Sequence, residues 1–302
     1  MSLPSLTAII LTYNEEQHIA RAIKSVSSVA ERICVIDSLS NDATVEIAKS
    51  LGAEVFSNPF ETHAAQLNWG IDNANIVSEW TLRIDADEIL EPLLQESIRN
   101  FTLAPEGANA AILRRKIVFL GQEIRNGFFY PILGIRLWKT GQGRAEQRWM
   151  DEHIVVVDPK IVTLKGDLRD ENLNDLSWWT TKHVGYAERE VYDTIARREN
   201  LSATSKFSGK AKQKRILKEQ VYSRLPSVFR SSLYFFYRYV LGLGFADGKA
   251  GFYFHFLQAY WYRTLVDAKL LELEQRAAEE NLRPFEYLQK QGVFDGVIKQ
   301  VE

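Results

Sequence analysis

Short apolar stretches alternate with segments of helical period along the first 85 residues, and this alternation restricts the fold more than any other feature. The stretches that predict strands are 6–11, 32–36, 53–57 and 80–84. The segments that predict helices, with apolar residues at helical spacing, are 19–26, 43–51 and 62–75. Strands and helices that alternate in this way form βαβ units, so we predict an α/β, Rossmann-like fold with a mainly parallel sheet.

The pattern changes after residue 109. Segments 110–113, 116–120, 132–138 and 154–157 predict short strands without helices between them, which favours a small antiparallel extension of the sheet. A charged helical region with a basic link follows, and then an aromatic-rich helical region. We therefore expect three parts, at residues 1–172, 173–224 and 225–302.

Composition excludes several classes of protein. The formal net charge of the 302 residues is -2, so no global charge draws the chain to nucleic acid, and we expect no such partner. The single cysteine, Cys34, excludes an internal disulfide and fits a reducing compartment. No apolar run approaches the roughly 18 residues that span a bilayer, and the N-terminus shows no secretion signal. We expect a cytoplasmic protein.

Polar clusters follow three of the predicted strands, at 12–16, 37–42 and 85–88. Because the carboxyl ends of parallel strands meet at one edge of a sheet, we expect these clusters to line one crevice. The first cluster has neither the Gly-x-Gly-x-x-Gly pattern of dinucleotide-binding folds nor a P-loop.

Asp85 and Asp87 follow the alternating segment Trp80–Ile84. In extended backbone, residues i and i+2 point to the same side, so both carboxylates would face one spot. Carboxylates at close range raise each other's pKa unless a cation lies between them, and hard oxygen ligands suit Mg²⁺ or Mn²⁺. The alternative is a solvated acidic turn before a helix that begins near Pro92.

The three clusters resemble the ordered motifs of family 2 glycosyltransferases, which have the GT-A fold. The matching segments are Thr12-Tyr13-Asn14-Glu15-Glu16, Asp37-Ser38-x-Ser40-x-Asp42-x-Thr44 and Asp85-x-Asp87. Segments 149–153 and 182–190 look like the bacterial branch that builds lipopolysaccharide core, capsule or exopolysaccharide. The Gln-x-x-Arg-Trp motif of processive members is absent, which favours addition of one sugar. By this resemblance, residues 1–172 are a GT-A catalytic domain.

The resemblance also implies how the donor nucleotide is bound. Thr12, Tyr13 and Glu15 would line the nucleotide. Asp37 would accept a hydrogen bond from the base, since a carboxylate is a strong acceptor for the uracil N–H group. The alternative is that Asp37 and Asp42 only cap a turn and a helix.

Inverting transfer from a nucleotide-sugar is the mechanism that the resemblance implies. Mn²⁺ or Mg²⁺ on Asp87, with Asp85 on the ribose or the metal, would offset the charge of the leaving diphosphate. His183 is a further candidate ligand of the metal or diphosphate, although a helical histidine is more often a hydrogen-bonded structural residue. Glu152, with Asp151 as the second choice, would accept the proton of the attacking hydroxyl. The alternative is that both are rim acids.

The sequence therefore predicts a transferase that adds one sugar, from a UDP-sugar, to a lipid-linked saccharide or lipopolysaccharide-core acceptor. The basic link before the aromatic-rich region predicts attachment to the inner face of the plasma membrane. A helical subdomain packed on the core or a dimer interface is the alternative. For the whole chain, the rival hypotheses are a sugar-nucleotide nucleotidylyltransferase and a non-catalytic module that binds nucleotide-sugars or membranes.

Overall fold

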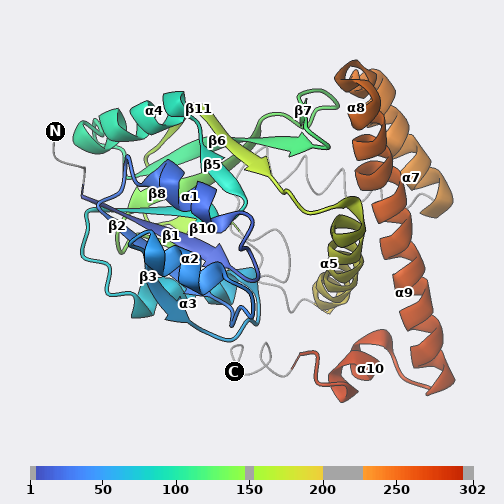
Figure 1. Ribbon diagram of the computed structural model, residues 1–302. Helices are drawn as coiled ribbons and strands as arrows, with labels where there is room; N and C mark the ends of the chain where they lie inside the picture. The colour runs from blue at the N-terminus through green and yellow to red at the C-terminus, as the bar shows by residue number, and fades with distance from the viewer. Residues whose placement is uncertain (1–4, 147–152, 200–226, 295–302) are drawn as a thin grey trace.

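Parallel strands form the first half of a nine-stranded sheet (Figure 1). They are β1 (Leu6–Thr12), β2 (Arg32–Asp37), β3 (Glu54–Ser57) and β4 (Trp80–Asp85). β1 lies between β2 and β4, and β3 pairs with the other side of β2. All residues of β1 are buried, as in a strand covered on both faces. The four parallel strands confirm the predicted α/β fold. The structure is a computed structural model that describes residues 5–146, 153–199 and 227–294.

Antiparallel pairing begins beyond β4. The strands are β5 (Glu88–Leu90), β6 (Ala110–Phe119), β7 (Gln122–Ile124), β8 (Ile132–Lys139) and β11 (Ile161–Glu171), with a separate pair of β9 (Gly143–Ala145) and β10 (Ile154–Val156). The sheet runs β3-β2-β1-β4-β8-β6-β11-β5, and β7 pairs with β6. The predicted antiparallel extension is confirmed, although β11 pairs with β6 in parallel and β6 is one strand instead of two. β5 and β11 were not predicted.

The register brings the carboxyl ends of the parallel strands level. Thr12 at the end of β1 lies opposite Asp37 on β2, and Leu11 lies opposite Asp85 on β4. Because these strands end at the same edge, the loops that follow them lie side by side there. The sheet therefore gathers polar segments that are far apart in the sequence.

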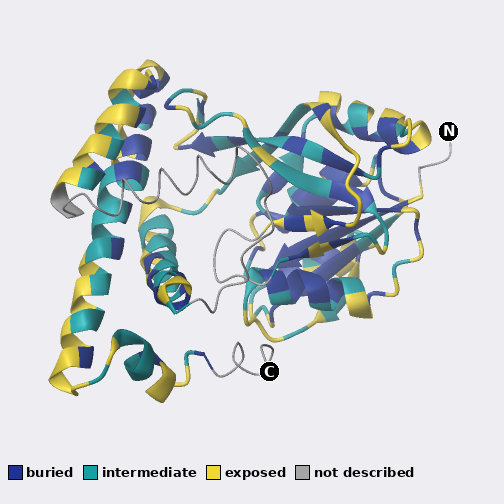
Figure 2. Cartoon of the chain, turned by 180° about the vertical axis from the view of Figure 1, so that it is seen from behind, coloured by how far each residue is buried: buried dark blue, intermediate teal, exposed yellow. Residues whose placement is uncertain are grey.

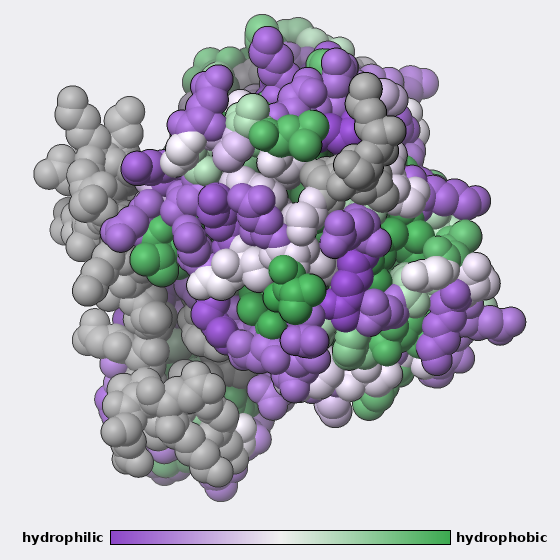
Figure 3. Space-filling model, turned by 90° about the vertical axis from the view of Figure 1, so that its left-hand side faces the viewer, coloured by the Kyte–Doolittle hydropathy of each residue, from purple (hydrophilic) through white to green (hydrophobic). Residues whose placement is uncertain are grey.

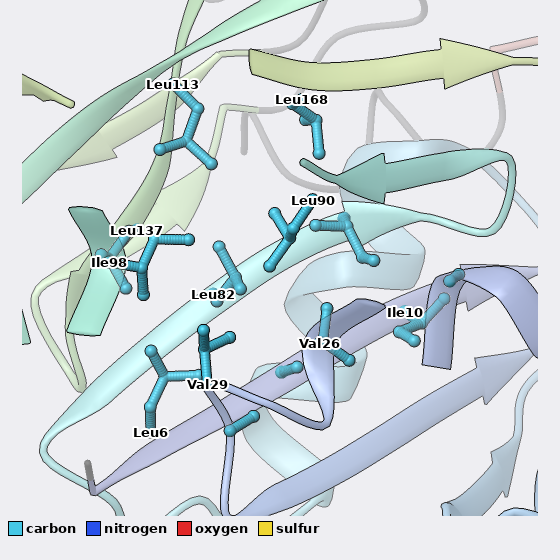
Figure 4. Close-up of a cluster of buried hydrophobic side chains, with 14 of the residues drawn as sticks. Leu6, Ile10, Val26, Val29, Leu82, Leu90, Ile98, Leu113, Leu137 and Leu168 are labelled. Atoms are coloured by element: carbon cyan, nitrogen blue, oxygen red, sulfur yellow. The ribbon is translucent and has the colours of Figure 1, made fainter. Parts of the chain in front are cut away.

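Helices cover both faces of the sheet. They are α1 (Ile19–Val26), α2 (Thr44–Ser50) and α4 (Pro92–Leu103) on one face and α3 (His63–Asn73) on the other. Figure 4 shows the first core, where Val26 of α1 and Ile98 of α4 meet Leu82 of β4. In the second core, Leu67 of α3 packs with Ile9 of β1. Burial is concentrated in this layered part, whereas the helices farther along the chain carry exposed residues on one side (Figure 2).

A helical region follows the sheet. It consists of α5 (Leu176–Arg198), α7 (Ser227–Phe236), α8 (Gly248–His255), α9 (Tyr262–Glu279) and α10 (Pro284–Lys290), with short π and 3-10 segments at η1 (Tyr237–Leu241), η2 (Gly244–Asp247) and η3 (Phe256–Trp261). This confirms the predicted helical C-terminal region. Across the described part of the chain, no helix combines the length and apolar character needed to cross a bilayer.

Polar contacts join this helical region to the loop between β7 and β8. The buried carboxylate of Asp247 accepts hydrogen bonds from the backbone N–H groups of Arg125 at 3.1 Å and Asn126 at 2.9 Å. The buried guanidinium of Arg238 donates to the carbonyl of Gly127 at 3.1 Å. Asp247 and Arg238 therefore dock the helical region on the loop between β7 and β8.

Gly166 is where β11 and α4 come closest. The register of β11 against β6 shifts between Thr163 and Asp167, and Gly166 has a φ of +85°. A Cβ atom there would lie 2.3 Å from the backbone nitrogen of Leu94. We expect Gly166→Ala to lower the free energy of unfolding by about 2–5 kcal/mol, from left-handed strain and overpacking together.

Denaturant unfolding measures this loss, and Gly121→Ala is the matched control. Gly121 has a φ of +76° with no atom within 4 Å of the added Cβ, so its replacement should cost only about 1–2 kcal/mol. Equal losses in the two variants would contradict the close packing of α4 on β11.

Candidate functional site

Hydrogen bonds join the loop after β1 to the loop after β2. The donors and acceptors are Thr12 Oγ1 to Asp37 Oδ1 (3.1 Å), Asn14 N to Ser40 Oγ (2.8 Å), Glu15 N to Thr44 Oγ1 (2.7 Å) and Glu16 N to Asp42 Oδ2 (3.1 Å). The polar residues of both motifs therefore fix the two loops to each other. This is a structural use of residues that the sequence suggested for ligand binding.

Asp37 and Tyr13 differ in accessibility. The side chain of Asp37 is buried, and it accepts hydrogen bonds from the Thr12 hydroxyl and from the backbone N–H (2.9 Å) and hydroxyl (2.5 Å) of Ser40. Tyr13 is 57% exposed. Asp42 lies one residue before Ala43, the N-cap residue of α2, and accepts a hydrogen bond from the Thr44 N–H group at 3.0 Å. Burial acts to raise the pKa of Asp42, but hydrogen bonds from Thr44 and Glu16 outweigh it and lower the pKa.

Glu15 is held by a histidine. Nδ1 of buried His18 lies 2.6 Å from Oε2 of Glu15. Nε2 of His18 accepts a hydrogen bond from the Leu173 backbone N–H at 2.8 Å, so the proton is on Nδ1, facing the carboxylate. This chain of contacts ties the loop after β1 to the segment after β11.

Arginines clamp Asp85 at the end of β4. Its carboxylate lies 3.1 Å from Nη2 of Arg83 and 3.6 Å from Nη1 of Arg136. Burial would raise the pKa of Asp85, but the positive charges of Arg83 and Arg136 prevail and hold it well below its usual range. Asp85 is therefore ionised, and its charge is already balanced by protein groups. Arg83 is itself buried.

Asp87 lies in the turn after β4 rather than in extended backbone, so the expectation that Asp85 and Asp87 share one side of a strand is wrong. Its Oδ2 accepts a hydrogen bond from Nδ2 of Asn172 at 3.1 Å. No Lys or Arg among the described residues forms a salt bridge with Asp87, in contrast to Asp85. The two carboxylates still share a neighbour, because both raise the pKa of Asp170.

Glu88 and Asp170 add two carboxylates, of which Glu88 belongs to the predicted cluster 85–88 and Asp170 was not predicted. Oε2 of buried Glu88 accepts a hydrogen bond from the Asp85 backbone N–H at 2.8 Å, and its Oε1 accepts from Arg136 at 2.9 Å. Asp170 lies opposite Glu88 in the pairing of β11 with β5, and 3.6 Å from Arg115. Burial, followed by the charge of Asp87, raises the pKa of Asp170 to about 7.

A sequence signal existed for part of this cluster. Arg136 stands within the segment 132–138 that was predicted to be a strand, and Arg115 lies between the predicted strands 110–113 and 116–120. A charged residue in a strand that is covered on both faces needs a buried partner of opposite charge. Asp170 had no such signal, because the strand that carries it was not predicted, whereas Glu88 belongs to the cluster 85–88 that the sequence predicted at this edge.

The cluster is suited to a divalent cation that also binds a ligand. Carboxylates of Asp85, Glu88 and Asp170 face the guanidinium groups of Arg83, Arg115 and Arg136, and the carboxylate of Asp87 lies outside these ion pairs. In the described residues, no group of three or more His, Cys, Asp and Glu side chains is arranged to enclose a metal. Mg²⁺ is usually held by one or two carboxylates and completed by water and substrate phosphates. Asp87, without an arginine partner, fits that type of site.

His183 lies among aromatic side chains of the helical region. Its Nδ1 is 2.8 Å from the carbonyl oxygen of Trp179, and its Nε2 is 3.0 Å from Nε2 of Gln258. Its ring stacks on Trp179 with the centroids 3.5 Å apart. Burial lowers the pKa of His183 to about 4. None of these contacts involves Asp85 or Asp87. Asp151 and Glu152, the candidate bases, lie outside the described residues.

The raised pKa of Asp170 predicts a pH effect on stability in the presence of a metal chelator. An acid with a higher pKa in the folded state binds more protons when folded, so stability falls as pH rises from about 4 through about 7. Asp170→Asn should remove this contribution, leaving a flatter dependence of the unfolding free energy between pH 5 and 8. Chemical denaturation at each pH measures it.

Asp72→Asn is the control for that experiment, because Asp72 pairs with Arg144 on the surface and its pKa is lowered by that hydrogen bond. Asp72→Asn should not flatten the fall. An Asp170→Asn variant with the slope of the unchanged protein would show that Asp170 is ionised throughout this range.

Comparisons with known proteins agree on one family. The family model described as glycosyl transferase family 2 matches residues 7–161. A Rickettsia typhi protein named as an uncharacterized glycosyltransferase is 41% identical over 96 residues, which cover 32% of this chain and 32% of that protein. LpsC of Rhizobium meliloti, named as a lipopolysaccharide core biosynthesis glycosyltransferase, is 26% identical over 146 residues, covering 47% of this chain and 53% of LpsC. The chain thus matches about a third to a half of the length of these relatives.

Two solved structures are similar over different shares of the chain. Glucosyl-3-phosphoglycerate synthase from Mycobacterium tuberculosis, in complex with Mn²⁺, UDP and glucosyl-3-phosphoglycerate, has 25% identity and a TM-score of 0.31, covering 38% of this chain and 44% of that one. A mannosyltransferase from Pyrobaculum calidifontis, in complex with GDP-mannose and Mn²⁺, has 14% identity and a TM-score of 0.48, covering 90% and 88%.

The family model spans slightly more than half of the 302 residues and includes all three strand-end clusters. The resemblance seen in the motifs is therefore confirmed: this chain belongs to glycosyl transferase family 2.

Proposed function

We propose that this protein is an inverting glycosyltransferase that moves one sugar from a nucleotide-sugar, with UDP-sugar as the expected donor. The acceptor is a lipid-linked saccharide or lipopolysaccharide core in the synthesis of a cell-envelope polysaccharide. The observation that carries the proposal is the carboxylate cluster at the end of β4, beside the joined loops after β1 and β2, in a chain of this family. The likeness to LpsC supports the choice of acceptor.

The loops after β1 and β2 are proposed to bind the nucleoside. A carboxylate has about four acceptor positions, and Asp37 uses three of them on Thr12 and Ser40, so one remains for the N–H group of a base. The exposed ring of Tyr13 offers a face on which the base can stack. Glu15, held by His18, contributes by fixing the loop.

Asp87 is proposed as the main protein ligand of Mn²⁺ or Mg²⁺. Asp85 is either a second ligand or a ribose ligand, since two arginines already balance its charge. When bound, the cation would offset the negative charge that develops on the leaving diphosphate. His183 remains a predicted ligand, with the least support, because its ring nitrogens face Trp179 and Gln258.

Glu152 is proposed as the base, with Asp151 as the second candidate. In the transfer step, the acceptor hydroxyl oxygen bonds to the anomeric carbon and gives its proton to the carboxylate. The bond from that carbon to the diphosphate oxygen breaks, and the electron pair leaves with the diphosphate. The carboxylate must therefore lie on the side of the sugar opposite the leaving group.

An exposed aromatic surface on the helical region supports attachment to a membrane from the cytoplasmic side. We define this aromatic surface as Phe229, Leu233, Phe236, Tyr237, Leu241, Leu243, Phe245, Phe252 and Tyr253, each at least 40% exposed. Clusters of exposed apolar side chains mark interaction sites, and aromatic rings suit the boundary of a bilayer. The side of the molecule shown in Figure 3 is mostly hydrophilic, with apolar residues in small separate patches. We propose that residues 1–172 catalyse transfer, and that residues 173–224 and 225–302 bring this catalytic part to the membrane.

Replacement of Asp87 is the direct test of the catalytic proposal. Release of UDP or GDP from a panel of UDP- and GDP-sugars should require Mn²⁺ or Mg²⁺ and stop with a chelator. Asp87→Ala should lower the rate by about 10²–10³-fold or more, since it removes the cation that stabilises the leaving group. Glu152→Gln, or else Asp151→Asn, should cause a loss of similar size.

Asp72→Ala, at a surface salt bridge with Arg144, is the control and should leave the rate within about twofold. Asp87→Ala should keep the melting temperature within a few degrees. Metal-independent turnover, or an active Asp87→Ala, would contradict the site. Release of pyrophosphate from UTP and a sugar 1-phosphate would instead identify a nucleotidylyltransferase.

Liposome sedimentation tests the aromatic surface. Phe229→Ser, Leu241→Ser and Phe245→Ser combined should reduce binding to vesicles rich in anionic lipid by about tenfold or more, since burial of each apolar side chain contributes about 1.5–3 kcal/mol. The matched control is Val77→Ser with Leu103→Ser, which are 81% and 72% exposed outside this surface. Absence of binding by the unchanged protein, together with a dimer in light scattering, would show that the surface is a protein interface.

A further inference from the structure

Helix α5 has two differently occupied faces. Trp179 and His183 point to the helical region, where they meet Trp261 (ring centroids 6.4 Å apart) and Gln258 (Nε2 atoms 3.0 Å apart). Figure 1 shows α5 between the sheet and the long helices of that region. Because residues four apart lie on one side of a helix, Trp178, Lys182 and Tyr186 form a different face.

Contacts at both ends place this part of α5 beside the strand ends. In the segment that leads into α5, Asn172 donates to Asp87 at 3.1 Å, and the Leu173 N–H group donates to His18 at 2.8 Å. Farther along, the guanidinium of Arg189 lies 5.8 Å from the ring of Phe60, in the segment between β3 and α3. Between these contacts, Nζ of Lys182 lies 4.5 Å from the ring centroid of Trp178 and 5.8 Å from that of Tyr186.

Lys182 is electrostatically linked to the carboxylate cluster. Burial acts to lower the pKa of Lys182, but the Tyr186 hydroxyl and the charges of Asp87 and Glu15 outweigh it and raise the pKa. The ammonium group is therefore charged at neutral pH. Asp87 also raises the pKa of Tyr186, after burial, which places both side chains near the turn that follows β4.

The ammonium group of Lys182 has no salt bridge with any carboxylate in the described ranges, although two carboxylates influence it. Asp85 and Glu88, by contrast, are each in direct contact with an arginine. Lys182 instead lies half-buried against two aromatic rings. The two rings therefore position the ammonium group, and no salt bridge within the described ranges neutralises its charge.

A cation bound to Asp87 would place a positive charge near Lys182, where the protein alone has the negative charge of a carboxylate. The ammonium group and the cation would repel each other, and an anion between them would be attracted to both. In the proposed reaction, the anionic group at this place is the diphosphate of the donor. We propose that Lys182 of α5 binds the donor diphosphate and stays bound to it as it leaves, an inference that rests on the proposed function.

The role is electrostatic and leaves the proton balance of the reaction unchanged. When the bond from the anomeric carbon to the diphosphate oxygen breaks, the electron pair stays on that oxygen, and its negative charge grows. A protonated lysine next to it stabilises this charge without giving up a proton. The proton released by the acceptor hydroxyl goes to the base, as in the proposed mechanism.

Binding of UDP and of uridine to Lys182→Met tests the inference, with Mn²⁺ present and NMR titration as the measurement. UDP affinity should fall by about 10–100-fold, the effect of losing one hydrogen bond between charged groups, while uridine affinity changes by less than about threefold. Lys182→Arg should keep most of the UDP affinity. Lys24→Met, an exposed lysine at the end of α1, is the control and should change neither.

A second measurement uses the unchanged protein and needs no variant to fold. UDP with Mn²⁺ should protect Lys182, and not Lys24, from acetylation by acetic anhydride, as read by mass spectrometry, and uridine should not protect it. Equal UDP binding by Lys182→Met, an equal loss of UDP and uridine, or no protection would overturn this inference alone. If the unchanged protein binds neither UDP nor GDP, the proposed function falls as well.

Discussion

The buried pairing of arginines with carboxylates at the end of β4 is the interaction on which the rest of the site depends. Removing an ionised carboxylate from water costs several kcal/mol unless a partner of opposite charge is supplied. Asp85 and Glu88 receive that partner from Arg83, Arg136 and Arg115, which stand on β4, β8 and β6. The network therefore requires the antiparallel strands to lie beside β4, and it ties the two halves of the sheet together. Asp87 lies next to these ion pairs without a salt bridge in the described residues, so its carboxylate can bind a ligand.

Helix α5 extends this arrangement from the sheet to the helical region. One face packs with α9 through Ala187, Val191 and Tyr262, and the other holds Lys182 near Asp87. The docking of Asp247 and Arg238 on the loop before β8 is a second connection. The exposed aromatic surface and the carboxylate cluster are thus held on one framework.

Local patterns predicted the first half of the fold well and the second half in part. The buried strands β1, β2 and β4 and their helices carry continuous apolar runs or regular spacing, which short windows of sequence reveal. β11 was missed because Gly166 and a register shift interrupt its apolar alternation, and β5 because it has only 3 residues. Without these strands, Asp170 could not be assigned to the site, and its position opposite Glu88 could not be predicted. The predicted pairing of Asp85 with Asp87 on one side of a strand failed because the strand ends at Asp85.

The sequence by itself determined the family, the α/β framework and the edge of the sheet where the site lies, because hydrophobic periodicity and strand-end motifs are local properties. Only the tertiary structure decided which carboxylates are paired with other protein groups and which can bind a ligand. Asp85 is balanced by arginines, Glu15 pairs with Nδ1 of His18, and Asp42 accepts from the Thr44 N–H group, whereas Asp87 has no arginine partner in the described residues. These differences come from contacts between segments far apart in the chain. The electrostatic state of a buried group depends on its neighbours in space, and the sequence around it does not contain them.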